Sequence, residues 1–189
     1  MRDREDRYYY SDVPEIGEHH YFLFNKEFDA ESTGEAIEFI IARNIMTKNR
    51  PKHMTMIINS PGGEISGAFA LIDIMKGSKV PVHTYGLGEI ASCGLMTFIA
   101  GEKGKRLITR NTAILSHQYS WHSSGKHNEL MATVKEFENT HKRILEHYKR
   151  CTGLTEAQIK KFLLPAQDVW LTAQEAVKYG IADEVVEFY

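Results

Sequence analysis

The chain has 189 residues, and its 23 Lys and Arg nearly balance its 25 Asp and Glu, giving a formal net charge of −2. This length suits a single domain with a well-buried core. The charge balance provides no basic surface of the kind that binds nucleic acid. No apolar run reaches the roughly 18 residues that a membrane span requires, so we expect neither nucleic acid nor a membrane among its partners.

Cysteine and histidine usage argues against a disulfide framework and against a metal site. The chain contains 2 cysteines and 9 histidines, with no His-Glu-x-x-His pattern and no paired Cys-x-x-Cys motifs. The pairs His19-His20 and His141/His147 are interpreted as solvated surface residues. We therefore expect a reduced, cytoplasmic protein that holds no metal.

The chain divides into a short arm and one folded unit. Residues 1–18 carry many charges without periodicity, so we expect a flexible arm ahead of a single domain over residues 19–189. In that domain, short apolar runs predict strands at residues 20–24, 54–58, 81–85, 107–109, 113–115 and 181–189. Helical patterns predict helices at residues 33–47, 65–75, 93–100 and 128–150, with shorter ones after Thr155 and Thr172. Three of these helices are opened by the capping-box pairs Ser32/Glu35, Thr155/Gln158 and Thr172/Glu175.

Two units of strand, glycine turn and helix follow one another. The first turn spans residues 59–63, Asn-Ser-Pro-Gly-Gly, and the second spans residues 86–94 with three glycines. Such a succession indicates a parallel α/β arrangement. Because ligands gather at the carboxyl ends of parallel strands, both turns are expected to border one site. The helix at 128–150 is longer than most globular helices, so we expect part of it to project or to pack on a partner.

Ser92 lies in the second glycine turn, where by itself it is an ordinary helix cap. A serine becomes a nucleophile only beside a base, which in turn needs an orienting group. His117, at the end of an apolar strand, is the best candidate base, and Asp168 is the candidate orienting acid. The backbone N–H groups of Gly63 and Cys93 would supply an oxyanion hole.

The surroundings of Ser92 exclude the common serine-hydrolase classes. The segment Ala91-Ser92-Cys93 fails the Gly-x-Ser-x-Gly pattern, and the order Ser, His, Asp differs from that of α/β-hydrolases, chymotrypsin-type and subtilisin-type enzymes. A serine hydrolase of another fold is required. A Cys93 nucleophile is a weaker alternative, because the thiol lies where a backbone donor is needed rather than beside His117.

Five motifs, in order and at the family's spacing, resemble the proteolytic subunit of the Clp protease, and the resemblance covers about residues 20–187. They are Ile58-Asn59-Ser60-Pro61-Gly62-Gly63, Gly88 to Gly94 with Ala91-Ser92-Cys93, Gly104-Lys105-Arg106 with Asn111, Ser116-His117-Gln118, and Asp168 ahead of residues 175–183.

The resemblance implies an α/β fold of the crotonase-like β/α spiral type, with residues 119–150 forming a handle that joins two heptameric rings. It implies Ser92 as nucleophile, His117 as base and Asp168 as third member, with Gly63 and Cys93 as oxyanion donors. The implied reaction is hydrolysis of peptide bonds in a closed chamber through an acyl-enzyme.

The resemblance also implies partners. Family members degrade short peptides alone and need a ring-shaped AAA+ unfoldase, which uses ATP, to degrade folded proteins. The peptidase itself would need no cofactor. Gly62, Ile65 and Gln118 are expected to border the substrate groove.

Several residues depart from the family pattern. Glu89 and Ile90 stand where small or apolar residues are usual, Tyr119 stands where proline is common, and Gln167 replaces an arginine that many members use in ring–ring ion pairs. Two alternative functions stay open beside that of a peptidase. One is a catalytically weak or regulatory subunit in a mixed ring, and the other is a crotonase-type acyl-CoA hydratase, which shares the fold but has no use for the triad.

Overall fold

The computed structural model describes residues 19–187 of the chain. The strands are β1 (Tyr21–Phe24), β2 (Met54–Ser60), β3 (Val82–Ala91), β4 (Arg106–Thr109), β5 (Ala113–Ser116), β6 (Val169–Leu171) and β7 (Glu184–Val186). The helices are α1 (Ala30–Ile45), α2 (Ile65–Gly77), α3 (Cys93–Ile99), α4 (His127–Thr152), α5 (Glu156–Phe162) and α6 (Ala173–Lys178).

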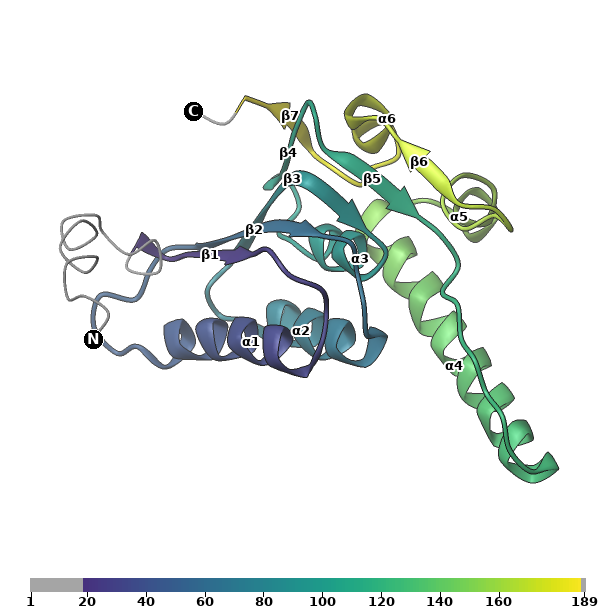
Figure 1. Cartoon of the computed structure of the whole chain (residues 1–189). Coiled ribbons are helices and arrows are strands. Elements are labelled where there is room, and N and C mark those ends of the chain that lie inside the picture. Colours follow the sequence, from purple (N-terminus) through teal and green to yellow (C-terminus); the bar gives the residue numbers. More distant parts are fainter. Residues whose placement is uncertain (1–18, 188–189) are drawn as a thin grey trace, which may run out of the picture.

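Within the described residues, the seven strands form one sheet in which β1, β2, β3, β4 and β7 lie side by side in parallel. The second half of β3 pairs in parallel with β5, which pairs antiparallel with β6. Figure 1 shows α1, α2 and α3 against the sheet and α4 extending away from it. The expected α/β fold with a projecting helix is therefore confirmed.

The core lies between the sheet and helices α1, α2 and α3, and it continues to the second half of α4 and to α5 and α6. Strand β2 is buried on both faces over most of its length, as the unbroken apolar run predicts. All seven residues of α3 are buried, so this short helix is enclosed between the sheet and its neighbours. None of the helices within residues 19–187 combines the length and apolar character needed to cross a membrane. The predicted arm, residues 1–18, lies outside the described residues, and the division into arm and domain stays a prediction.

Strand β3 is longer than the sequence predicts. The sequence predicts a turn from Gly86 onward, but the strand continues to Ala91, since its first half pairs with β4 and its second half with β5. Gly88 adopts a φ of 67°, and a side chain there would lie 2.5 Å from the amide oxygen of Asn59. The glycines thus bend a continuous strand and admit neighbouring side chains instead of ending it.

Helix α1 begins earlier than the predicted capping box at Ser32. The cap is Asp29, whose carboxylate accepts the Ser32 N–H at 2.7 Å while the Ser32 hydroxyl accepts the Asp29 N–H at 3.0 Å. Ser32 is therefore the third residue of α1 and the partner of the cap, and the cap itself is Asp29. The boxes at Thr155 and Thr172 are confirmed.

Helix α4 has two distinct parts. Its buried residues lie in its second half, while Met131 and Val134 in its first half are exposed. Figure 1 shows the extended segment after β5 running beside the projecting part of α4.

The interpretation of His147 as solvated is wrong: it is buried and its Nε2 lies 2.8 Å from the Met96 carbonyl oxygen. Burial lowers the pKa of His147 to about 4, so the ring is neutral and ties α4 to α3.

Arg106 is the largest buried polar side chain, with 2% of its surface exposed. Its guanidinium donates to the Asp183 carboxylate and to the carbonyls of Cys151 and Gly180, so it joins β4, the end of α4 and the segment before β7. Burial alone would raise the pKa of Asp183, but hydrogen bonds from Arg106 and from the Gly104 N–H outweigh it and hold this pKa below its usual value.

Replacing Arg106 by methionine should lower the free energy of unfolding by about 3 kcal/mol. The change removes the guanidinium donor from the partly buried Asp183 carboxylate and from the carbonyls of Cys151 and Gly180. Urea denaturation followed by circular dichroism, at one protein concentration, measures this loss. Lys26→Ala is the control, since it breaks an exposed ion pair with Glu35 and should matter far less. Equal effects of the two substitutions would contradict a structural role for the buried pair.

Candidate active site

Ser92 occupies the junction of β3 and α3 in a strained conformation. Its φ of 53° and ψ of −118° lie in a region that residues other than glycine rarely adopt. The backbone is held on both sides, because the Ser92 N–H donates to the Leu115 carbonyl and the Ser92 carbonyl accepts from the Met96 N–H, each at 3.0 Å. The hydroxyl makes no capping hydrogen bond to α3. Ser92 is therefore not the ordinary helix cap that its position in the sequence allowed.

The glycine turn after β2 lies directly against Ser92. Gly62 and Gly63 have φ values of 104° and 143°, which favour glycine. A side chain at position 62 would place its Cβ 2.6 Å from the Cβ of Ser92, and one at position 63 would lie 2.3 Å from the Phe28 carbonyl oxygen. Glycine is thus required at both positions for the turn to approach this closely.

The hydrogen bonds of this turn set the direction of the Gly63 backbone. The Gly62 carbonyl accepts from the Phe28 N–H, and the Glu64 N–H donates to the Phe28 carbonyl, each at 2.7 Å. Because backbone groups alternate in direction along an extended segment, the N–H and carbonyl of Gly63 point away from Phe28. The Cys93 thiol, which donates to the Gly63 carbonyl at 3.2 Å, lies on that side. The Gly63 N–H therefore faces α3.

Cys93 is the first residue of α3, so its N–H has no acceptor within the helix. A Cβ at position 62 would lie 3.1 Å from this nitrogen, which places the turn and the helix start side by side. Burial raises the pKa of the Cys93 thiol to about 11, so the thiol stays protonated near neutral pH. This argues against Cys93 as a nucleophile, because the thiolate is the reactive form.

His117 and Asp168 are brought together by the antiparallel pairing of β5 with β6. Ser116 pairs with Val169, so the next residue on one strand meets the preceding residue on the other. His117 Nδ1 lies 3.6 Å from an Asp168 carboxylate oxygen, with side-chain exposures of 26% and 64%. His117 Nε2 is buried and has no hydrogen-bond partner among residues 19–187. It is the ring nitrogen left to meet a group in the cavity.

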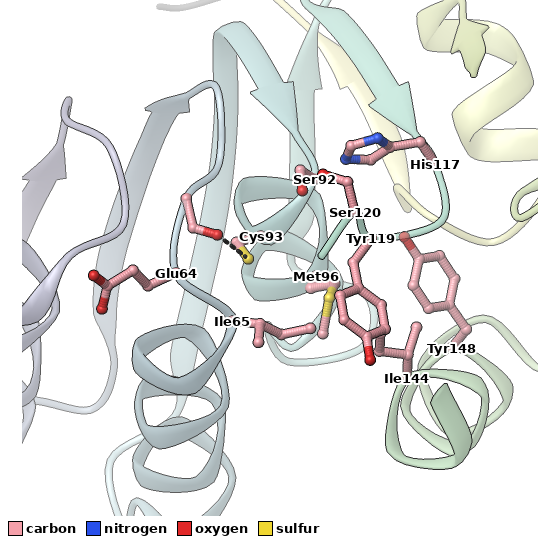
Figure 2. A pocket seen from close by; sticks show the side chains of 11 residues that line it. Glu64, Ile65, Ser92, Cys93, Met96, His117, Tyr119, Ser120, Ile144 and Tyr148 are labelled. Atoms are coloured by element: carbon pink, nitrogen blue, oxygen red, sulfur yellow. Dashed lines mark hydrogen bonds between the residues drawn. The ribbon is translucent and has the colours of Figure 1, made fainter. Parts of the chain in front are cut away.

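Ser92 and His117 line one cavity of about 250 Å³ (Figure 2). Of the predicted groove residues, only Ile65 lines it. Gly62 contacts Ser92 without lining the cavity. Gln118 points elsewhere, since its side-chain amide donates to the Leu164 carbonyl at 3.2 Å. Six further lining residues were not predicted from the sequence: Glu64, Met96, Tyr119, Ser120, Ile144 and Tyr148.

A signal for two of these residues was present in the sequence. Ile144 and Tyr148 are four residues apart on the apolar stripe of α4, so they share one face of that helix. Tyr148 is buried, and its hydroxyl lies 3.2 Å from the hydroxyl of Ser116, the residue before His117. The sequence does not show, however, that this face of α4 packs against β5 and α3.

The unusual residues before Ser92 stay outside the cavity lining. Glu89 is half-buried, and its N–H donates to the side chain of Asn59 at 2.9 Å. Ile90 is completely buried in the core. In the described part of the chain, no group of three or more His, Cys, Asp or Glu side chains is arranged to hold a metal ion.

Gly62→Ala should lower the free energy of unfolding by about 1–3 kcal/mol, because the new methyl group collides with Ser92. The same substitution should slow any chemical modification of the Ser92 hydroxyl. The control is Gly34→Ala, in the interior of α1 with open space around the added Cβ, which should instead stabilise the protein by up to about 1 kcal/mol. Urea denaturation of both variants is the measurement, and a neutral Gly62→Ala would contradict the close approach.

The chain is similar to known proteins over most of its length. The model of the family described as Clp protease matches residues 8–188. The ATP-dependent Clp protease proteolytic subunit 2 of Thermobifida fusca is 34% identical over 160 residues, which cover 81% of this chain and 78% of that protein. The protein of the same name from Corynebacterium diphtheriae is 35% identical over 136 residues, covering 72% of this chain and 67% of the relative. The chain therefore belongs to the Clp protease family, and it is a serine-type peptidase.

Proposed function

We propose that the protein hydrolyses peptide bonds inside a ring-shaped chamber, through an acyl-enzyme formed on Ser92. The observation that carries this proposal is the placement of Ser92. Its strained backbone lies against the Gly62-Gly63 turn, and it shares a cavity with the unpartnered Nε2 of His117.

The reaction follows from these positions. His117 Nε2 accepts the proton of Ser92 Oγ as that oxygen bonds to the carbonyl carbon of the peptide. The carbonyl oxygen becomes negatively charged and is stabilised by the N–H groups of Gly63 and Cys93, each of which contributes about 10²–10³ in rate. His117 then gives its proton to the leaving amine as the C–N bond breaks. Water repeats the sequence and releases the acyl group from Ser92.

Asp168 has the role of holding His117 in the tautomer with a proton on Nδ1. The separation of 3.6 Å is longer than a hydrogen bond. Hydrogen bonds of this kind often tighten only when substrate binds, so the distance in the free chain is compatible with the role. The exposure of Asp168 leaves room for it to move toward the ring.

The cavity favours an apolar side chain on the substrate residue that precedes the cleaved bond. Its walls include the side chains of Ile65, Met96, Ile144 and two tyrosines, while the carboxylate of Glu64, which also borders the cavity, points away from these side chains in Figure 2. Burial of apolar surface contributes about 25 cal/mol per Å², so such a side chain would bind here in preference to a charged one. Peptides and unfolded segments are the corresponding substrates.

Assembly is the second part of the proposal. Met131, Val134 and Trp121 leave apolar surface exposed on the projecting handle, residues 119–150, which a second ring would cover. We propose heptameric rings, single or stacked in pairs, in the cytoplasm. An ATP-using AAA+ unfoldase would supply unfolded chains, while the peptidase itself uses no cofactor. A mixed ring in which this subunit is weakly active is the alternative.

A fluorophosphonate probe should label the native protein on Ser92, because the hydroxyl is activated by His117. Ser92→Ala should abolish labelling, and intact-mass and peptide mass spectrometry would locate the adduct. Cys93→Ala, which removes the neighbouring thiol, should keep it. Labelling that survives Ser92→Ala would refute the nucleophile assignment, and a hydratase of the same fold would not be labelled at all.

Asp168→Asn should reduce peptide turnover by on the order of 10³–10⁴, because asparagine favours the wrong His117 tautomer. Steady-state kcat with a fluorogenic peptide measures this, and native mass should stay unchanged. Turnover equal to that of the unmodified protein would remove Asp168 from the catalytic group.

The native particle should have the mass of a heptamer or of an integral multiple of it. Native mass spectrometry with analytical ultracentrifugation measures this mass directly. Val134→Lys should drive double rings toward single rings, since it places a charge on the exposed apolar part of α4. A stable monomer would contradict the chamber model.

A further inference from the structure

Tyr119 stands two residues after His117 and forms part of the cavity wall. In Figure 2 its ring is seen between Met96 and Ile144, which also line the cavity. The ring therefore occupies space that a substrate side chain would otherwise fill.

The ring is held in place by the handle. The Tyr119 hydroxyl donates to the Phe137 carbonyl on α4 at 3.2 Å, and the two rings pack with centroids 5.1 Å apart. Trp121 packs on the same Phe137 ring at 5.2 Å. Tyr119 can leave the cavity only if it breaks these contacts, so it acts as a fixed wall. Phe137 supports this wall but does not itself line the cavity.

We propose that Tyr119 determines the specificity of the reaction by limiting the substrate residue before the cleaved bond to medium-sized apolar side chains, such as leucine and methionine, and excluding tryptophan. Phe137 is the positioning residue that keeps Tyr119 in the cavity. This inference rests on the proposed function, because it assigns the cavity to the substrate residue that Ser92 attacks. It links the choice of substrate to the packing of the handle.

The test compares two fluorogenic peptides that differ only in leucine or tryptophan before the cleaved bond. The ratio of kcat/KM for tryptophan over leucine should be low in the unmodified protein and should rise about tenfold or more in Tyr119→Ala. Tyr119→Phe keeps the ring and should retain the low ratio. An unchanged ratio in Tyr119→Ala would overturn the proposal.

A second arm tests the support from α4. Phe137→Ala should raise the ratio in the same direction as Tyr119→Ala, though less, because the Tyr119 ring gains freedom to swing aside. Lys135→Ala, an exposed position on the same helix, should leave the ratio unchanged. Circular dichroism checks that each variant is folded. A ratio that responds equally to Lys135→Ala and Phe137→Ala would contradict the positioning role.

Binding measurements separate this inference from the proposed function. In a Ser92→Ala background, the dissociation constants of N-acetylated product peptides ending in leucine or tryptophan report the cavity without the chemistry. The preference for leucine should be lost when Tyr119→Ala is added. Absence of Ser92-dependent hydrolysis in the unmodified protein would refute the proposed function, whereas an unaltered binding preference would refute the role of Tyr119.

Discussion

The backbone of the Gly62-Gly63 turn packs against Ser92 and Cys93, and the geometry of the site depends on this contact. A side chain at position 62 would collide with Ser92, and one at position 63 would collide with the backbone of Phe28 on the other side of the turn, so sterics require glycine at both positions. The Ser92 conformation costs on the order of 1–3 kcal/mol and persists only because its surroundings determine it. Those surroundings are the hydrogen bonds to Leu115 and Met96 and the contact with Gly62. The carboxyl ends of β2, β3 and β5 thus meet at one serine.

Helix α4 serves both the cavity and the projecting handle. Ile144 and Tyr148 from its base line the cavity, while Met131 near its other end is exposed. Buried polar contacts join the second half of α4 to the segments around the site. The Tyr148 hydroxyl lies beside the hydroxyl of Ser116, and the His147 ring lies beside the carbonyl of Met96. A shift of α4 would therefore move β5, which precedes His117, and α3, which follows Ser92.

Local patterns in the sequence were sufficient to predict the parallel α/β fold, the first residues of most helices and the kinds of side chain that lie at the site. Chemistry and family resemblance together point to Ser92, His117 and Asp168, and the β5–β6 register explains why the last two meet. The sequence could not reveal that His147 is buried or that Tyr119 turns into the cavity. Both outcomes depend on how α4 packs against distant segments of the chain. The polarity of the two side chains alone would place each of them at the protein surface.

The most direct test of the central claim is the structure of the protein after reaction with a fluorophosphonate. Continuous density from Ser92 Oγ to phosphorus is predicted, with one phosphoryl oxygen about 2.7–3.1 Å from the backbone nitrogens of Gly63 and Cys93. An adduct on another residue, or a phosphoryl oxygen turned away from both N–H groups, would contradict the assignment of the nucleophile and its oxyanion hole.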